Sequence, residues 1–190
     1  MLHEKRFDPS KANKLISEER IKLLNPDSII LELPINENDF IADLGAGNGF
    51  FTVPAAKETN KTVYAVDIEP KMLDMLKERT ENEGLTNIEY AVSDLEAINI
   101  KGNAVDKVLA AFVLHEVGSI KQVLHEIKRI LKPGGKVLLL EWEAVETEDG
   151  PPLEIRLSSD ELNKMLQENG FHTKLIQLND FHYAIKAVPN

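Results

Sequence analysis

The sequence has no cysteine among its 190 residues. Disulfides, thiolate metal sites and cysteine nucleophiles are therefore excluded, and the composition agrees with the reducing cytoplasm, where we expect the protein to reside. It also lacks an apolar run of the roughly 18–20 residues that a transmembrane helix needs, so we expect no membrane span. No apolar stretch follows the charged N-terminus, so we expect no secretory signal.

Basic residues are also scarce. The chain has 22 Lys and Arg against 32 Asp and Glu, a formal net charge of −10. A protein that binds nucleic acid usually shows a basic stripe, because each phosphate contact displaces condensed counterions. Here the densest basic run is "HEIKRILK", residues 125–132. We therefore expect no nucleic-acid partner, and because no two histidines have metal-ligand spacing we expect no metal.

The length favours a single domain over residues 1–190, with a helical segment at 1–34 and a core at 39–190. In the core, strand-like runs alternate with helical ones. Strands are predicted at 40–44, 62–68, 87–92, 106–114, 136–142, 172–179 and 181–188. Helices are predicted at 25–33, 50–58, 69–84, 119–135 and 158–170, where capping residues and prolines or glycines mark the ends.

Strands separated by helices predict a parallel sheet covered on both faces. The apolar runs "VLAAFVL" and "KVLLL" are typical of strands buried on both sides. Little more than Asp180 separates the last two strands, which suggests an antiparallel pair. In such sheets a ligand binds beyond the carboxyl ends of the strands, so the residues after each strand are the candidates for a site.

A glycine-rich turn, "DLGAGNGF", follows the first strand. Its glycines are Gly45, Gly47 and Gly49, and Phe50 stands where a dinucleotide-binding loop has its third glycine. No Gly-Lys-Ser/Thr follows, so the turn is not a phosphate loop. It permits close approach of the backbone to a ligand, but a plain turn between strand and helix remains open.

Two acids stand at neighbouring strand ends. Asp67 lies 18 residues beyond Gly49, where a carboxylate can accept both hydroxyls of a ribose. Asp94 ends the third strand and can accept from an exocyclic amine. Helix capping remains the alternative for either acid alone. Together with the glycine turn, the two acids favour a nucleoside-containing ligand.

In these motifs the chain resembles the class I S-adenosylmethionine-dependent methyltransferases, and in their order it resembles the branch with quinone-biosynthesis C-methyltransferases. The resemblance rests on "DLGAGNG", "VYAVDI", "SDLE", "VDKVLAAFVLHEV" and "LKPGGKVLLLEW", within 39–142, and on the closing helix and strand pair. It implies a three-layer, Rossmann-like α/β sandwich with a seven-stranded, mostly parallel sheet in the order 3-2-1-4-5-7-6. It also implies S-adenosylmethionine as cofactor and S-adenosylhomocysteine as product.

The resemblance further implies which residues hold the cofactor. Adenine is expected near Asp94 and Leu95, the ribose at Asp67, and the methionine part across the glycine turn, with Asp43 beneath it. Carbonyls of Gly45 and Ala110 would receive the ammonium. The full set is Asp43, Gly45, Ala46, Gly47, Gly49, Asp67, Ile68, Met72, Ser93, Asp94, Leu95, Ala110 and Phe112.

Methyl transfer needs alignment and exclusion of water, and alignment alone can supply about 7–11 kcal/mol. A general base is needed only when the acceptor must lose a proton. His115, after the fourth strand, is the candidate base, with packing against the next helix as the open alternative. Glu116 and Glu141, also at strand ends, are candidates to orient a substrate. We expect less of His182, which lies in a closing strand far in sequence from these strand ends.

Two segments are candidate lids. One is the N-terminal segment, where Phe7, Lys14 and Arg20 are placed to close over cofactor or acceptor. The other is the acidic run 143–156 after the fifth strand, because loops of that length are uncommon unless functional or mobile. A solvated surface excursion is the alternative for this second segment.

The acceptor is narrowed only by elimination. The Asn-Pro-Pro-aromatic motif of enzymes that methylate nucleobase or amide nitrogens is absent, which leaves a small organic molecule as the favoured acceptor. Two other functions stay open. A domain that binds the cofactor without turnover fits the same motifs. An NAD(P)-dependent oxidoreductase is disfavoured by Phe50 and by the lack of a Tyr-x-x-x-Lys pair in 110–130.

Overall fold

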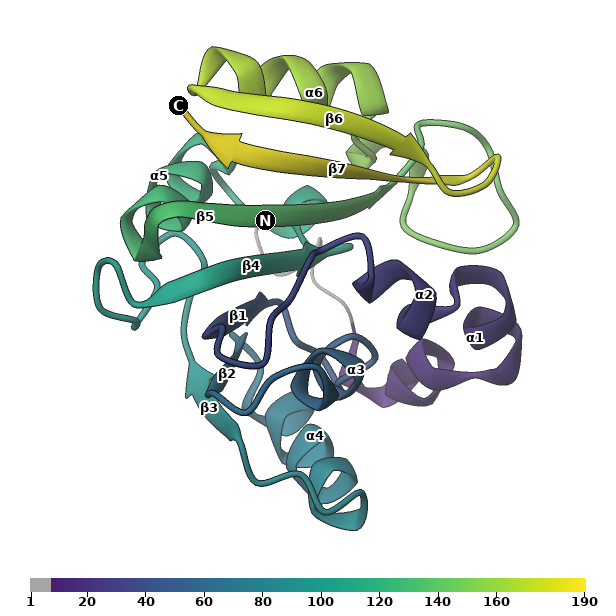
Figure 1. Ribbon diagram of the computed structural model, residues 1–190. Helices are drawn as coiled ribbons and strands as arrows, with labels where there is room; N and C mark the ends of the chain where they lie inside the picture. The colour runs from purple at the N-terminus through teal and green to yellow at the C-terminus, as the bar shows by residue number, and fades with distance from the viewer. Residues whose placement is uncertain (1–7) are drawn as a thin grey trace.

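The computed structural model describes residues 8–190, which form one seven-stranded sheet with helices on both faces (Figure 1). The strand order is β3-β2-β1-β4-β5-β7-β6. β7 lies antiparallel between β5 and β6, and the other strands pair in parallel. The predicted α/β class, strand order and closing antiparallel pair are therefore confirmed. The strands are β1 (Ile41–Leu44), β2 (Val63–Asp67), β3 (Ile88–Val92), β4 (Val105–Ala111), β5 (Leu131–Trp142), β6 (Phe171–Gln177) and β7 (His182–Pro189).

Helices precede the sheet and connect its strands. The α-helices are α1 (Glu18–Leu24), α2 (Pro26–Ile30), α3 (Thr52–Lys57), α4 (Pro70–Asn82), α5 (Ile120–Ile130) and α6 (Ser159–Glu168). The 3₁₀ helices are η2 (Pro9–Ile16), η3 (Leu114–Glu116) and η4 (Leu153–Ile155). None of the helices within residues 8–190 combines the length and apolarity that crossing a bilayer requires.

Successive residues of each strand send their side chains to opposite faces of the sheet. Val108 of β4 belongs to the core that includes Val123 of α5 and Leu162 of α6. Its neighbour Leu109 belongs to the core on the other face, which includes Ile30 of α2. Each such side chain, fully buried, contributes about 1.5–3 kcal/mol. The sheet is thus the middle of three layers, with α1 to α4 on one face and α5 and α6 on the other (Figure 1).

The predicted helix boundaries hold where a side chain caps the helix. The Ser119 hydroxyl accepts from the Gln122 N–H at 3.3 Å at the start of α5. Ser158 and Glu161 form the predicted capping box of α6. Pro54 is the third residue of α3, within its first turn, where no intrahelical hydrogen bond is lost.

The boundary between α5 and β5 was predicted wrongly. The helix expected over 119–135 ends at Ile130, and β5 begins at Leu131, before the predicted start at Lys136. Pairing with β4 jumps from Leu131 opposite Val105 to Lys136 opposite Lys107. The intervening Pro-Gly-Gly therefore forms an irregularity inside β5. Proline and glycine interrupt a strand ladder as readily as they end a helix, so the motif alone does not separate the two.

Candidate functional site

The glycine turn and Asp67 are joined directly. The turn follows β1, and its three glycines have positive φ: +76° at Gly45, +53° at Gly47 and +87° at Gly49. The Gly47 N–H donates to Asp67 Oδ2 at 2.8 Å, while Asp67 Oδ1 accepts from the Glu69 N–H at 2.9 Å. A carboxylate offers about four lone-pair positions. About two therefore remain at the end of β2 for a ligand that donates hydrogen bonds.

Two of the glycines are required by packing. A Cβ at Gly49 would lie 2.1 Å from Leu76 Cδ1, and one at Gly45 would lie 2.6 Å from Val113 Cγ2. A side chain at either position would have to displace the side chain of Leu76 or of Val113. These two positions therefore fix the turn against its neighbours.

Gly47 has more room, and the N-terminal segment supplies it with a cover. The nearest atoms to a Cβ at Gly47 would be Met72 Cε at 3.5 Å and Leu15 Cδ1 at 3.7 Å. Next to it, the Asn48 amide donates to the Ala12 carbonyl at 2.8 Å. η2 therefore lies against the glycine turn, so the turn is walled by α4 and by the N-terminal segment.

Asp43 places a carboxylate beneath the turn. It is 2% exposed on the α3 face of β1, and its Oδ2 accepts from the Thr52 hydroxyl at 2.5 Å. Burial raises the pKa of Asp43 to about 7, and the nearby Asp67 carboxylate contributes to the rise. A cation above the turn would favour the ionised form of this group. The pair of carboxylates thus suits a positively charged ligand.

The end of β3 is organised by Ser93 and Asp94. The buried Ser93 hydroxyl accepts from the Asn99 N–H at 3.0 Å. The exposed Asp94 accepts from the Glu96 N–H at 2.9 Å through Oδ1. Asp94 therefore caps a turn and not a helix, which was the alternative that the sequence left open, and its second oxygen makes no hydrogen bond within residues 8–190. Ser93 shapes the turn that presents Asp94.

Most of the residues expected to hold the cofactor lie at the carboxyl ends of β1 to β4. Ile68 is half-buried and offers apolar surface next to Asp67, whereas Leu95, next to Asp94, packs into the core. Ala110 is fully buried inside β4, opposite Leu44, so only its backbone can take part.

β4 ends earlier than predicted. The strand expected over 106–114 stops at Ala111, because Phe112 has a φ of +58° and turns the chain away. Its N–H donates to the Leu140 carbonyl at 2.8 Å, which holds the turn on β5. A bulky residue in the left-handed region costs about 1–2 kcal/mol, and such strain concentrates at functional sites.

Phe112 belongs to an aromatic cluster at this edge of the sheet. Its ring centroid lies 6.4 Å from that of Phe51, 6.0 Å from Trp142 and 5.4 Å from His182. Trp142 and His182 are paired across β5 and β7, with ring centroids 4.2 Å apart. We call Phe50, Phe51, Phe112, Trp142 and His182 the aromatic cluster.

His182 lies nearer to the strand ends than its place in the sequence suggested. β7 runs antiparallel, so its first residue lies at the edge where β4 and β5 end. Burial, with the charges of Arg20 and Arg156, lowers the pKa of His182 to about 4. The side chain is therefore a neutral imidazole at neutral pH. The antiparallel pairing of the last two strands, which the sequence had already suggested, could have indicated this position of His182.

The N-terminal segment brings Arg20 onto the aromatic cluster. Its guanidinium carbon lies 5.2 Å from the Phe50 ring centroid and 5.1 Å from that of Phe112. Burial lowers the pKa of Arg20 to about 10, so the group stays cationic at neutral pH. Lys14 is exposed on η2, and Phe7 lies outside the described residues.

His115 lies on the opposite face of the sheet, in η3. Its Nδ1 is 2.9 Å from Oε2 of Glu141, a fully buried carboxylate. Glu141 Oε1 accepts from the N–H of Leu114 at 2.8 Å, and His115 Nε2 is 3.8 Å from Glu116 Oε1. Burial lowers the pKa of His115, but the Glu141 and Glu116 carboxylates outweigh it and raise the pKa above its ordinary value.

A cavity of about 540 Å³ borders His115. Its walls come from η3 and the start of α5 on one side and from η4 and α6 on the other, and they include Ser119, Lys121 and Arg156. His115 is thus buried and near a cavity at once. Glu141 holds it in place and does not itself face open space.

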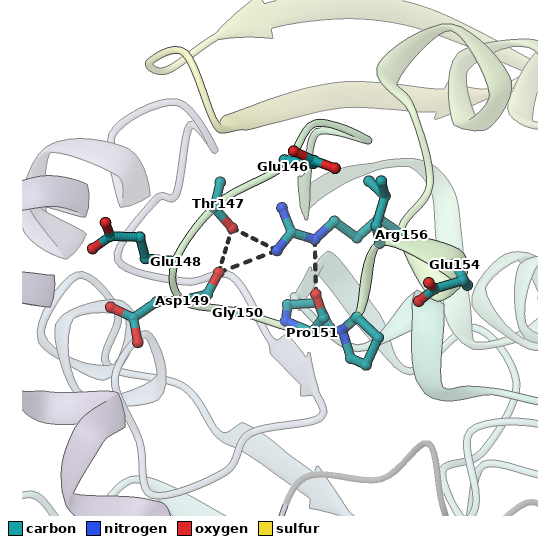
Figure 2. Close-up of a pocket in the computed structure, with 10 residues that line it drawn as sticks. Glu146, Thr147, Glu148, Asp149, Gly150, Pro151, Glu154 and Arg156 are labelled. Carbon is teal, nitrogen blue, oxygen red and sulfur yellow. Dashed lines mark hydrogen bonds between the residues drawn. The ribbon is translucent and has the colours of Figure 1, made fainter.

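The segment 143–156 forms a loop built around Arg156 (Figure 2). The guanidinium donates to the carbonyls of Val145 at 2.7 Å, Pro151 at 2.9 Å and Asp149 at 3.1 Å, and to the Thr147 hydroxyl at 2.6 Å. The loop lines an open hollow of about 680 Å³ beside these contacts. The hydrogen bonds from Arg156 therefore hold the two sides of the loop together.

The same loop covers the aromatic cluster. The Arg156 guanidinium carbon lies 5.0 Å from the Trp142 ring centroid, and a Cβ at Gly150 would lie 2.9 Å from the same ring. The loop therefore packs on Trp142 through Arg156 and Gly150. Within residues 8–190, no group of three His, Asp or Glu side chains is placed to hold a metal ion.

Together these residues can bind a ligand and fix its orientation. The β1, β2 and β3 ends present hydrogen-bond acceptors and negative charge, and the β4, β5 and β7 ends present aromatic surface with a half-buried cation. Sequence reasoning missed Trp142 and the rest of the aromatic cluster apart from Phe112, because these side chains have no motif of their own.

Comparisons with known proteins agree with this geometry. The family profile described as a methyltransferase domain matches residues 42–139. A ubiquinone/menaquinone biosynthesis C-methyltransferase UbiE from Hydrogenovibrio crunogenus is 35% identical over 114 residues, 58% of this chain and 45% of that protein. The chain therefore spans less than half the length of this curated relative.

Solved structures share the whole fold. A crystal structure described as a SAM-dependent methyltransferase from Aquifex aeolicus has a TM-score of 0.89 and 29% identity, and the match covers 96% of this chain and 98% of that one. The [4+2]-cyclase SpnF has a TM-score of 0.75 at 17% identity, covering 87% and 80%, which shows a shared fold alone.

Proposed function

We propose, from the premise that the chain belongs to the methyltransferase domain family, that it uses S-adenosylmethionine to methylate a small organic acceptor. The main observation behind this proposal is the 2.8 Å hydrogen bond from the Gly47 N–H to Asp67. It holds the glycine turn next to a carboxylate that keeps some of its lone pairs available, at the ends of adjacent strands. The proposal includes a cytoplasmic location, which a chain without cysteine favours.

The residues of the turn fit this cofactor. The Asp67 carboxylate has about two lone-pair positions left for the two ribose hydroxyls. The buried Asp43, with its raised pKa, suits the positive charge of a sulfonium and an ammonium. Ile68 offers apolar surface and Asp94 a polar edge for a base. When bound, S-adenosylmethionine supplies an electrophilic methyl group whose transfer leaves a neutral thioether.

The protein's own part is positioning and exclusion of water. η2 lies against the glycine turn, and the loop 143–156 covers Trp142, so bulk water is kept from the strand ends. Alignment of two bound reactants can supply about 7–11 kcal/mol of the barrier. No general base is required for an acceptor that is already an anion.

His115 is our candidate to take up a proton when an acceptor that must lose one is bound on the face of the sheet where η3 lies. Its Nδ1 faces the Glu141 carboxylate, so we assign the Nδ1–H tautomer, which leaves Nε2 to accept the proton. Glu141 acts as a positioning residue, since it holds both the ring and η3. Glu116 lies near Nε2 and is proposed to help orient the acceptor.

Calorimetric titration tests the cofactor assignment. S-adenosylmethionine and S-adenosylhomocysteine should bind the wild type, and NAD should not. Asp67→Ala should weaken both by tenfold or more, because the ribose loses two hydrogen bonds to a charged group. Asp74→Ala, which removes an exposed carboxylate from α4, is the matched control. An unchanged affinity in Asp67→Ala would refute the assignment of Asp67 to the ribose.

Binding alone does not establish methyl transfer. A domain that binds the cofactor without turnover would give the same titration result. A solved structure with the same fold is named as a [4+2]-cyclase, so the fold alone does not identify the reaction. Incorporation of a labelled methyl group into members of a small-acceptor library decides between the two. Cofactor binding with no labelled product across the library would favour the non-catalytic alternative.

A further inference from the structure

A half-buried cation at the aromatic cluster lacks a counter-charge within residues 8–190. Arg20 Nε is buried and has no hydrogen-bond partner, and no carboxylate lies within ion-pair distance of Arg20 among residues 8–190. Its contacts are the faces of the Phe50 and Phe112 rings. Ring faces attract a guanidinium but do not satisfy its N–H groups. The position is therefore suited to an anion from a ligand.

His182 offers an unused acceptor beside this cation. Asn179 Oδ1 accepts from the backbone N–H groups of Phe181 at 2.9 Å and His182 at 3.0 Å, so this atom is oxygen. His182 Nδ1 lies 3.0 Å from the same oxygen and must therefore donate to it. The neutral ring is left with a lone pair on Nε2, which is buried and has no partner in residues 8–190.

Both groups lie on the other half of the sheet from Asp67 and Asp94, the acids expected to hold the ribose and the adenine. The glycine turn, Asp67 and Asp94 follow β1, β2 and β3, whereas Phe112, Trp142 and His182 lie at the ends of β4, β5 and β7. Arg20 contacts Phe112, and its charge acts on His182. The Phe112 and Trp142 rings give this half flat apolar walls.

We propose that Arg20 and His182 form the polar end of the acceptor site, and that the acceptor is a small, flat hydroxy acid. Its ionised oxygen pairs with the Arg20 guanidinium, and its hydroxyl donates to Nε2 of His182. The inference rests on the proposed function, because it names the substrate class of the same site. A carboxylate and an enolate or phenolate share this chemistry, and the probes below separate them.

Binding to the protein saturated with S-adenosylhomocysteine provides the test. The probes are 2-, 3- and 4-hydroxybenzoate, the matching hydroxybenzamides and the matching methoxybenzoates. At least one hydroxybenzoate should bind about tenfold or more tightly than its amide, as a charge-assisted contact allows. The same acid should bind better than its methoxy analogue, which cannot donate to His182. Acids that bind no better than their amides would overturn the inference.

Variants assign the effect to the two side chains. Arg20→Gln should bring acid and amide within about threefold of each other. His182→Phe should remove the preference for hydroxyl over methoxy while the ring remains. Lys22→Gln is the control, because Lys22 is an exposed cation on the same helix, paired with Glu18 at 3.6 Å. An equal loss in Lys22→Gln would reduce the effect of Arg20 to general charge and contradict the proposal.

Other readouts separate the alternatives. If Arg20→Gln weakens S-adenosylhomocysteine but not 5′-methylthioadenosine, Arg20 holds the carboxylate of the cofactor and the acceptor assignment is wrong. If Arg20→Met unfolds at a lower temperature than the wild type, the cation is a structural element and the proposal falls. We expect an equal or higher unfolding temperature, because the variant removes an unpaired, half-buried charge. Failure of the wild type to bind S-adenosylhomocysteine would instead refute the proposed function.

Discussion

The Gly47 N–H donates to the Asp67 carboxylate at 2.8 Å, across the ends of two neighbouring strands. The bond couples the shape of the glycine turn to the position of the acid, although the two residues lie 20 positions apart in the sequence. A change in either should therefore alter the other. The glycines of the turn can be separated experimentally, because only some of them are needed for packing.

Gly49→Ala should mainly lower the stability of the fold, whereas Gly47→Ala should mainly lower the affinity for the cofactor. At Gly49 the added methyl would lie 2.1 Å from Leu76, so we expect a loss of about 2–4 kcal/mol in the free energy of unfolding. At Gly47 the neighbours are 3.5 Å away or more, so only the backbone conformation is penalised, by about 1–2 kcal/mol. Gly47→Ala should instead lose cofactor affinity. Urea unfolding and calorimetry measure the two effects, and equal stability losses would contradict the assignment.

Asp43→Asn should stabilise the folded protein at high pH. The folded pKa of about 7 exceeds the ordinary 3.8, so the native state binds the proton more tightly than the unfolded chain. The wild type therefore loses stability as pH rises from about 4 to 7, on the order of 2–4 kcal/mol. The variant lacks this loss, and the Thr52 hydroxyl can still donate to its amide oxygen.

Urea unfolding at pH 5 and pH 8 checks this expectation. The stability advantage of Asp43→Asn should be larger at pH 8 than at pH 5. Asp94→Asn, at an exposed carboxylate, should show no such widening. A constant difference across the two pH values would mean that Asp43 is not protonated in the folded state.

Glu141→Gln should lower the pKa of His115, because burial is then opposed only by the Glu116 carboxylate. The raised pKa of the wild type stabilises the fold fully below about pH 6.5, and the contribution disappears as pH rises through the folded pKa. The variant should therefore lose about 1–3 kcal/mol at pH 5.5 and less at pH 9. Proton NMR of the imidazole and urea unfolding give the two measurements, and an unmoved His115 pKa would refute the coupling.

Arg156→Gln should loosen the loop 143–156 and leave the core intact. The guanidinium supplies hydrogen bonds to three carbonyls and one hydroxyl of the loop, and a shorter amide cannot reach them all. Hydrogen exchange of the loop amides should quicken about tenfold or more, as loss of one or two net hydrogen bonds predicts. Lys164→Gln, on the exposed side of α6, is the control. Exchange that quickens equally throughout the sheet would point to global destabilisation.

The cofactor half of the site follows closely from the sequence. The glycine turn and the two acids each follow directly after a strand that is recognisable in the sequence. Gly47, Asp67 and Asp94 were therefore placed correctly at the ends of adjacent strands. Caps such as Ser119 and Ser158 act within one turn of chain, so helix starts were also readable.

The other half depends on contacts between distant parts of the chain. Nothing near Phe112 in sequence announces a positive φ, since the conformation is held by β5 and by neighbouring rings. Arg20 and His182 meet the same ring from opposite ends of the chain. Their roles follow from the order and direction of strands, which the sequence predicted, combined with side-chain packing, which it did not.

The antiparallel entry of β7 has a consequence for how this fold diversifies. It brings His182 to the edge where the parallel strands end, and both Arg20 and His182 lie outside the matched stretch 42–139. If these two side chains form the acceptor site as proposed, acceptor preference can change through the terminal segments without a change in the glycine turn or Asp67. Grafting 8–38 and 143–190 onto a related core should transfer selectivity as a module, independent of the machinery between them.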